Sequence, residues 1–340
     1  MKKVFLSACV VSALALTNVA LAGIVDIELK ADTSLGAAAS SITVTATNRG
    51  DVEERISRWD LPIEFEGSLG APLLDVTHDG QPVDYIGKLV KRADGDESDL
   101  IRLASGQAIA MKVDVAHAYD LTQGGRFEVR YKADDTQVSR KRATTGNAII
   151  IDVAPSMPKF AAAAFNQVAA GDTQFRSCTA DQTRAIQGAR RAAGQMINGA
   201  HSAMSRTSAG NRYRYWFGNH DNQRYASVKD KVGKIKLAVD NAGITVDCGC
   251  SDRGIYAYVY PNRPYDIYVC GAFWSAPEAG TDSRGGTLVH ELSHFTIVAG
   301  TQDHAYGQTA ARQLAQNDPA RAIANADNYE YFSENTPNHD

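Results

Sequence analysis

Two kinds of hydrophobic pattern divide this chain. Before about residue 135, apolar and polar residues alternate along the runs 25–29, 42–46, 109–115 and 127–131. A period of two is typical of strands with one buried face, and turn signals such as Asp79-Gly80 separate the runs. This density of short strands predicts an all-β, sandwich-like domain over residues 23–135.

After residue 173 the apolar residues follow a helical spacing. The stretches 179–204 and 221–241 predict two helices, and a third helical stretch lies around 319–331. Short strand-like runs lie between them, at 244–248, 255–260 and 266–270. We therefore expect residues 173–340 to form an α+β domain in which helices dominate.

Two further segments lie outside the predicted domains. Residues 1–22 have the layout of a secretory signal peptide, because two lysines precede a short apolar run and Ala20-Leu21-Ala22 supplies a small-x-small cleavage pattern. The run is too short for the alternative, a membrane anchor, so we expect a secreted, extracellular protein with no membrane association after export. Residues 136–172, with a basic cluster, prolines and an alanine-rich stretch, are expected to be a linker and processing region.

Composition and cysteine content narrow the class of protein. The chain is 44% hydrophobic and 22% charged, which is ordinary for a globular protein. Its net charge of −4 argues against a nucleic-acid-binding surface. Without the signal peptide, four cysteines remain: Cys178, Cys248, Cys250 and Cys270. An even number in an oxidising compartment favours two disulfides over a Cys-x-Cys metal site. Three pairings stay open, although Cys248 and Cys250 are expected to bond to different partners.

The stretch 287–307 contains the residues best suited to catalysis. Its H-E-x-x-H motif at 290–294 places two histidines on one helix face, where they can bind one zinc ion. Glu291 would flank the metal, in position to take a proton from a zinc-activated water. The opposite face is expected to pack through Leu288, Leu292 and Phe295. A bare motif also occurs on ordinary amphipathic helices, so the residues that follow it matter.

A third ligand is expected after the helix. Gly300 is predicted to be the C′ residue that ends the helix, so that the chain turns back and brings Asp303 to the metal. Three protein ligands with an open fourth position are what a catalytic zinc site requires.

The C-terminal half resembles the aspzincin family, which comprises deuterolysins and peptidyl-Lys metalloendopeptidases. The motif at 290–294 is followed by Gly300-Thr301-Gln302-Asp303-His304-Ala305-Tyr306-Gly307, which fits the family signature G-T-x-D-x-x-Y-G. Blocks at 258–263, 270–274 and 325–335 are similar to the peptidyl-Lys branch, and the likeness covers essentially all of 173–340. More loosely, residues 85–92 resemble the propeptide domain of the same family.

The resemblance implies a role for individual residues. His290, His294 and Asp303 would bind one zinc ion. Glu291 would be the general base and then the proton donor to the leaving amine, and Tyr306 would stabilise the oxyanion. His304 is expected to be a loop residue. Asp327 and Glu330, three apart on a helix, would bind the lysine ammonium on the C-terminal side of the cleaved bond. The implied disulfides join Cys178 with Cys248, and Cys250 with Cys270.

The sequence and the resemblance together predict a secreted zinc metalloendopeptidase, made as a zymogen, that cuts proteins and peptides on the N-terminal side of lysine. The β domain would be a propeptide that assists folding and inhibits its own enzyme, with Lys88 or Lys91 as a mimic of the substrate lysine. Two alternatives stay open. One is a protease of the same family with broader specificity, and the other is an exported binding or adhesion protein whose zinc is structural.

Overall fold

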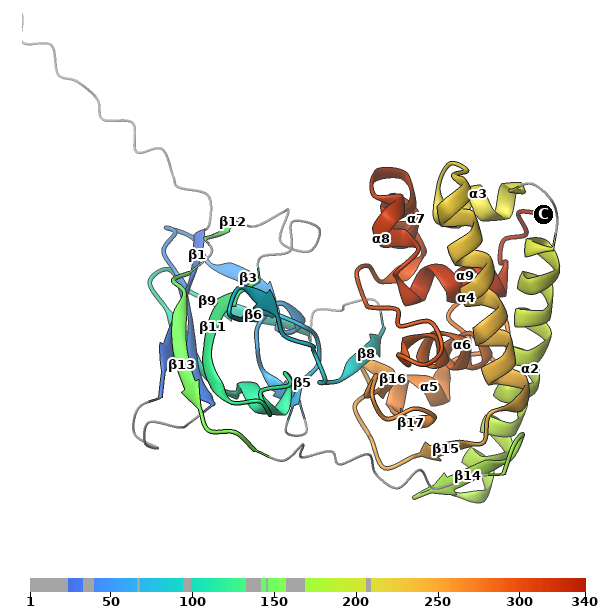
Figure 1. Cartoon of the computed structure of the whole chain (residues 1–340), viewed down its shortest axis with the longest axis horizontal. Coiled ribbons are helices and arrows are strands. Elements are labelled where there is room, and N and C mark those ends of the chain that lie inside the picture. Colours follow the sequence, from blue (N-terminus) through green and yellow to red (C-terminus); the bar gives the residue numbers. More distant parts are fainter. Residues whose placement is uncertain are drawn as a thin grey trace, which may run out of the picture.

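The protein has a β-rich N-terminal region and a helical C-terminal region, which lie side by side in the computed structural model (Figure 1). The structure describes residues 24–32, 40–65, 68–93, 99–132, 142–144, 146–156, 169–205 and 209–340. The predicted signal peptide lies outside these residues, as do most of the basic cluster at 139–142 and part of the predicted linker. None of the helices in the described part of the chain combines the length and apolar character that a membrane span needs.

Two four-stranded sheets form most of the N-terminal region. Their strand orders are β10-β2-β1-β12 and β13-β11-β6-β7. The bounds are β1 Ile24–Ala31, β2 Ser41–Asn48, β6 Leu74–His78, β7 Gln81–Pro82, β10 Ala108–Asp114, β11 Gly125–Tyr131, β12 Arg142–Thr144 and β13 Ile149–Val153. In β2 every second residue is buried, and residues of both sheets, such as Val44 and Phe127, share one hydrophobic core. This sandwich-like arrangement agrees with the alternating pattern of the sequence.

The β-rich region continues beyond residue 135, the boundary expected from the sequence. β12 pairs in parallel with β1, and β13 pairs antiparallel with β11. These two strands therefore fall inside the segment predicted to be a linker. The remaining short elements of the region are β3 Glu54–Ser57, β4 Glu64–Phe65, β5 Ser68–Leu69, β9 Leu100–Leu103 and the 3₁₀ helices Arg58–Asp60 and Val115–His117.

Two long helices frame the C-terminal region, close to where the sequence predicts them. α2 (Ala180–Met204) begins with a capping box, because the Thr179 hydroxyl accepts from Gln182 N while the Gln182 side chain accepts from Thr179 N. α4 (Asn222–Asn241) begins after Asp221, whose carboxylate accepts a hydrogen bond from Arg224 N. The apolar faces of both helices enter one large core.

Shorter helices surround this core. They are α3 Asn211–Phe217, α5 Gly271–Ser275, α6 Arg284–His294, α7 Gly307–Asn317, α8 Pro319–Ala322 and α9 Ala326–Glu334. The last two replace the single helical stretch predicted around 319–331, whereas α3, α5 and α7 are not predicted. α6 lies against α2 at Gly285, where an added Cβ would be 2.9 Å from the Cβ of Ala192. A small residue is therefore required at this helix contact.

α6 ends earlier than the sequence predicts. The helix stops at His294, because Phe295 leaves helical geometry with a ψ of 130°. A separate turn follows, in which Gly300 N donates to Phe295 O at 3.1 Å, and Gly300 adopts a φ of +57°. Gly300 thus has the left-handed conformation expected of it, but it closes this turn and is not the C′ residue of α6. Thr301 N then donates to Ser293 O, which returns the chain to the end of the helix.

The C-terminal sheet contains a strand from the N-terminal region. Its order is β14-β15-β17-β16-β8, with β14 Thr173–Arg176, β15 Ile244–Asp247, β16 Ile255–Val259 and β17 Asp266–Val269. β8 (Leu89–Arg92) pairs antiparallel with β16 and bridges the two regions in Figure 1. Lys91 lies opposite Ala257 in this pairing, and Val90 lies opposite Tyr258. β8 therefore covers what is otherwise the edge of the C-terminal sheet.

Two disulfides tie the C-terminal sheet together. Cys178, just before α2, is bonded to Cys248 at the end of β15. Cys250 is bonded to Cys270, which follows β17. These are the pairings that the family resemblance implies. Each bridge of this kind typically stabilises a protein by about 2–4 kcal/mol.

Candidate active site

The residues predicted to bind a metal meet at the end of α6. His290 and His294 come from the helix, and Asp303 comes from the chain that returns after the Gly300 turn. The Asp303 Oδ1 atom lies 3.2 Å from His290 Nε2 and 3.4 Å from His294 Nε2. All three side chains are buried, and their ligand atoms lie within 4.8 Å of one another. The structure thus brings together the three residues that the sequence singled out.

The atoms that face one another in this group lack hydrogen-bond partners. Among the described residues none makes a hydrogen bond to Nε2 of either histidine or to the Asp303 carboxylate oxygens. Buried polar atoms are normally paired, so a cation is the simplest group that satisfies all of them. Two imidazoles and one carboxylate are a donor set that suits zinc. The residues present therefore fit a zinc ion.

The other nitrogen of each histidine is held in place. His290 Nδ1 lies 2.9 Å from Asp327 Oδ1 and 3.2 Å from Glu330 Oε2. His294 Nδ1 lies 2.9 Å from the carbonyl oxygen of Thr301. Such contacts fix the orientation of a ligating ring and increase its basicity. They leave Nε2 of each ring directed at Asp303.

The electrostatics of the group favour a positive charge. Burial acts to lower the pKa of His290, but Asp303, Asp327 and Glu330 outweigh it and raise this pKa well above its ordinary value. Burial acts to raise the pKa of Asp303, yet the two histidines hold it well below the usual range. Both shifts indicate a site that attracts a cation, whether a proton or a metal ion.

Glu291 is a buried carboxylate beside the predicted metal ligands. Its side chain is fully buried, and neither oxygen has a hydrogen-bond partner among the described residues. Burial raises the pKa of Glu291 to about 8, although the neighbouring His290 acts to lower it. A carboxylate with a pKa near neutrality is well matched to accepting and returning a proton.

Tyr306 follows Asp303 by three positions and directly precedes α7. Burial, and then the Asp303 carboxylate, raise the pKa of Tyr306 well above its ordinary value. Its phenol therefore stays protonated at neutral pH and can donate a hydrogen bond. The guanidinium of Arg92, from β8, lies 4.0 Å from the centre of its ring.

Asp327 and Glu330 form an acidic pocket on α9, and a lysine from β8 occupies it. Lys91 Nζ lies 2.7 Å from Glu330 Oε2 and 3.8 Å from Asp327 Oδ1. A third carboxylate, Asp282, contributes an oxygen at 3.7 Å. Lys91 is only 1% exposed, and the ring of Tyr256 lies 5.0 Å from its ammonium. The sequence points to the two acids of α9 but gives no local signal for Asp282, which precedes α6.

Glu334 is a further acid that the sequence reasoning missed. It lies one turn after Glu330 on the same helix, and its Oε1 accepts hydrogen bonds from Ser283 N at 2.9 Å and Ser283 Oγ at 2.8 Å. Burial and then Glu330 raise the pKa of Glu334 to about 9, against these hydrogen bonds, which lower it. Glu334 thus links the acidic pocket to the start of α6.

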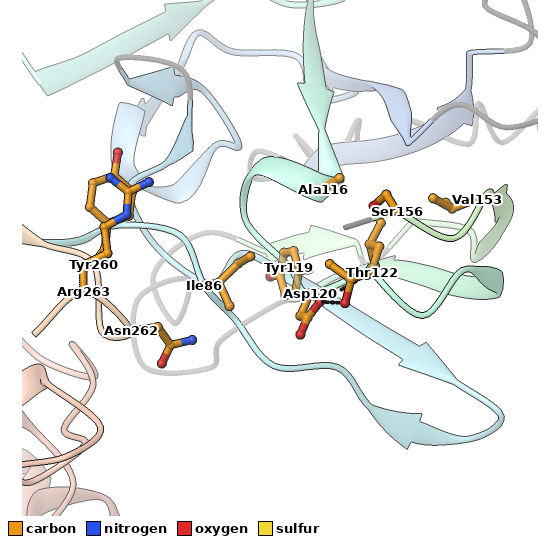
Figure 2. A pocket seen from close by; sticks show the side chains of 11 residues that line it. Ile86, Ala116, Tyr119, Asp120, Thr122, Val153, Ser156, Tyr260, Asn262 and Arg263 are labelled. Atoms are coloured by element: carbon orange, nitrogen blue, oxygen red, sulfur yellow. Dashed lines mark hydrogen bonds between the residues drawn. The ribbon is translucent and has the colours of Figure 1, made fainter. Parts of the chain in front are cut away.

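A pocket of about 140 Å³ lies apart from this site, between the two regions of the protein. Figure 2 shows Asn262 and Arg263 from the loop after β16 on one side, Asp120 and Thr122 on the other, and Ile86 between them. Its lining includes neither the metal-binding group nor the acidic pocket. The contact between the regions is thus loosely packed here and tightly packed around Lys91.

Comparison with known proteins places these features in a family. A family described as lysine-specific metallo-endopeptidase matches residues 202–334. An extracellular protease of Aeromonas hydrophila is 42% identical over 309 residues, covering 87% of this chain and 88% of that protein. A peptidyl-Lys metalloendopeptidase of Armillaria mellea is 32% identical over 344 residues, covering 98% of this chain and 95% of that protein. Among solved structures, a zinc peptidase from Grifola frondosa is 45% identical, with a TM-score of 0.47, and covers 48% of this chain and 100% of that one.

The site and the relatives together define a zinc metalloendopeptidase. The chain belongs to the aspzincin family, as the motif at 290–294 and the signature that follows it indicated.

Proposed function

We propose that the protein is a secreted endopeptidase that cuts on the N-terminal side of lysine and is made as a zymogen. One observation carries this proposal: a lysine from the N-terminal region is buried in the acidic pocket, with Nζ 2.7 Å from Glu330 Oε2. The names of the relatives, an extracellular protease and a peptidyl-Lys metalloendopeptidase, support the same conclusion. The N-terminal signal pattern supports export.

The proposed chemistry assigns one task to each residue near the metal group. His290, His294 and Asp303 would hold zinc, which when bound would acidify water and polarise the carbonyl of the cleaved bond. Glu291 takes a proton from the attacking water and then gives it to the leaving amine of the lysine residue. The protonated phenol of Tyr306 donates a hydrogen bond to the carbonyl oxygen as negative charge develops there.

The acidic pocket supplies the preference for lysine. Glu330, Asp327 and Asp282 surround an ammonium, which is a compact group with three donors. An arginine would have to place a wider, planar guanidinium in the same space. Asp327 also accepts a hydrogen bond from Gly307 N at 2.7 Å, directly after Tyr306, so the pocket and the candidate catalytic residues form one unit.

The full chain is an inactive zymogen because β8 occupies the site. Lys91 takes the place of a substrate lysine, and Arg92 covers the ring of Tyr306. The strand is also hydrogen-bonded along β16, so a substrate cannot use that edge. Residues 23–135, extended by the strands up to Val153, act as an intramolecular inhibitor. Processing within residues 136–172 would release it.

Mapping of cut sites tests this function. The full chain and its Glu291→Gln variant are incubated with a mixed peptide library, with and without a zinc chelator, and the new N-termini are identified by mass spectrometry. We expect cuts before lysine, made by the parent after activation and abolished by the variant or the chelator. Cuts without a lysine preference would favour a protease of broader specificity, and an unchanged Glu291→Gln variant would favour a structural zinc.

A further inference from the structure

A second lysine of the N-terminal region is buried against aromatic rings of the C-terminal sheet. Lys88, just before β8, is 0% exposed. Its Nζ lies 4.7 Å from the ring centre of Tyr258 and 5.9 Å from that of Tyr260. Both distances are within the range of cation–π attraction. The ammonium thus lies on an aromatic surface three residues before the lysine that fills the acidic pocket.

The position of this surface follows from the strand register. Val90 is opposite Tyr258 in the antiparallel pair, so Lys88 is its diagonal neighbour on the same face. The ring of Tyr258 stacks on Tyr268 of β17, with centres 4.7 Å apart and an angle of 2° between the planes. β17 and β8 flank β16 on opposite sides. Tyr258 is therefore supported on the side of β17 and presents its ring to whatever strand takes the place of β8.

We propose that Tyr258, flanked by Tyr260, forms a second substrate subsite that takes a cationic side chain three residues before the cleaved lysine. This inference rests on the proposed function, because the position is counted from the lysine in the acidic pocket. A substrate that pairs with β16 in the direction of β8 places that side chain where Lys88 lies.

Tyr258 is the main platform of the subsite. The guanidinium of Arg263 already lies 4.3 Å from the ring centre of Tyr260, and a like charge there opposes a second cation. The ring of Tyr258 lies closer to the Lys88 ammonium than the ring of Tyr260 does, and it packs against the neutral ring of Tyr268. Cation–π attraction at sites open to solvent favours a cation by about two- to fivefold in binding, and we take this range for a peptide bound in place of β8.

Matched peptides test the subsite. Each peptide contains one lysine, and the residue three positions before it is arginine, trimethyllysine or norleucine. Trimethyllysine keeps the charge but cannot donate a hydrogen bond, so it isolates the attraction to the rings. A control series places arginine or norleucine two positions before the lysine. The enzyme is expressed as the full chain, purified in the form that cleaves casein, and assayed for kcat/KM.

We expect kcat/KM to be about two- to fivefold higher for arginine and trimethyllysine than for norleucine at the third position, and equal in the control series. The ratio should persist in Tyr258→Phe and fall to one in Tyr258→Leu. A Tyr260→Leu variant, which leaves the stacked pair intact, should reduce the ratio in part. A loss of folded enzyme would lower both rates and leave the ratio unchanged.

The outcomes separate this subsite from the proposed function. Equal rates for the cationic and neutral peptides, with cuts still made before lysine, would overturn the subsite and leave the function standing. A preference that persists in Tyr258→Leu would also overturn it. Cuts with no preference for lysine would overturn the proposed function. They would also overturn the subsite, because its position is counted from the cleaved lysine.

Discussion

The ammonium of Lys91 lies 2.7 Å from the carboxylate of Glu330, although the two residues are separated by most of the chain. Lys91 belongs to a strand of the N-terminal region, and Glu330 belongs to the helix that also positions His290. This ion pair therefore joins the N-terminal region to the helix that supports His290. In the proposed zymogen, it is a contact through which the β-rich region blocks the candidate active site.

Replacing Lys91 by methionine should loosen the closed form. The side chain stays long and unbranched but no longer neutralises the buried carboxylates, a change that typically costs about 3–5 kcal/mol. We expect faster hydrogen–deuterium exchange of the β16 amides in Lys91→Met, measured in a Glu291→Gln background to prevent self-cleavage. Lys112→Met is the control, because the Lys112 side chain is 79% exposed and its pair with Asp32 lies at the surface. Equal exchange in the two variants would contradict the prediction.

Replacing Glu291 by glutamine should remove activity without removing the metal. Glutamine has the same shape but cannot accept the proton of the attacking water. We expect kcat to fall by at least about 10²-fold, while the zinc content measured by atomic absorption stays near that of the parent. A variant that digests casein at the parent rate would show that Glu291 takes no part in the chemistry.

Replacing Asp327 by asparagine should affect the metal as well as the substrate. Asp327 Oδ1 lies 2.9 Å from His290 Nδ1, and its other oxygen accepts from Gly307 N. Loss of such a support typically weakens metal binding by about 10–100-fold. We expect a chelator competition titration to show weaker zinc binding, together with a higher KM for lysine peptides. Unchanged zinc affinity would mean that Asp327 does not support His290.

The contribution of Lys91 should be independent of pH in the neutral range. Burial acts to lower the pKa of Lys91, but Glu330, Asp327 and Asp282 outweigh it and hold the pKa well above the ordinary 10.5. A group whose pKa is raised on folding stabilises fully below its ordinary pKa and loses this effect only as pH rises through the folded value. The Tm difference between parent and Lys91→Met, both in the Glu291→Gln background, should be constant from about pH 7 to about pH 10. A Tm difference that increases as pH rises from about 7 to about 10 would show that folding lowers the pKa of Lys91 below 10.5.

Adding a methyl group at Gly286 should disturb the acidic pocket. An added Cβ would lie 2.1 Å from Glu334 Oε1 and 3.0 Å from Glu330 Oε1. Glu334 cannot easily move, because it accepts two hydrogen bonds from Ser283. We expect Gly286→Ala to lower the free energy of unfolding by about 1–3 kcal/mol and to raise KM for lysine peptides. Gly194→Ala in α2 is the matched control, since nothing lies within 4 Å of its added Cβ. Equal stability of both variants would argue against this crowding.

The grouping of His290, His294 and Asp303 was predictable because their spacing is local. Two histidines one helical turn apart share a face whatever the rest of the fold does, and Asp303 follows after a turn that only a residue with positive φ closes easily. The residue at which α6 ends was harder to predict from the sequence. Val298 and Ala299 continue the apolar pattern, so the sequence predicts a longer helix, whereas Phe295 packs into the core and directs the chain away.

The acidic pocket was only half predictable, because tertiary packing assembles it. Asp327 and Glu330 are three apart on one helix, and this spacing can be read from the sequence. Asp282 and Lys91 reach the pocket from a loop and from a distant strand. A four-residue strand that leaves its own region to join another sheet has no periodic signal, because its pattern is too short to show which sheet it completes. The strands at residues 142–153 escaped prediction for the same reason.

Under the proposed function, the pairing of β8 with β16 also limits which proteins this enzyme can attack. A chain that replaces β8 must give up its own backbone hydrogen bonds over several consecutive residues, since the edge of β16 accepts only an extended partner. A lysine in a stable helix of a folded target does not meet this requirement, however exposed its side chain is. The protease should therefore find its targets in denatured proteins, frayed termini and long loops, and its rate on a native protein should follow the local unfolding of the target.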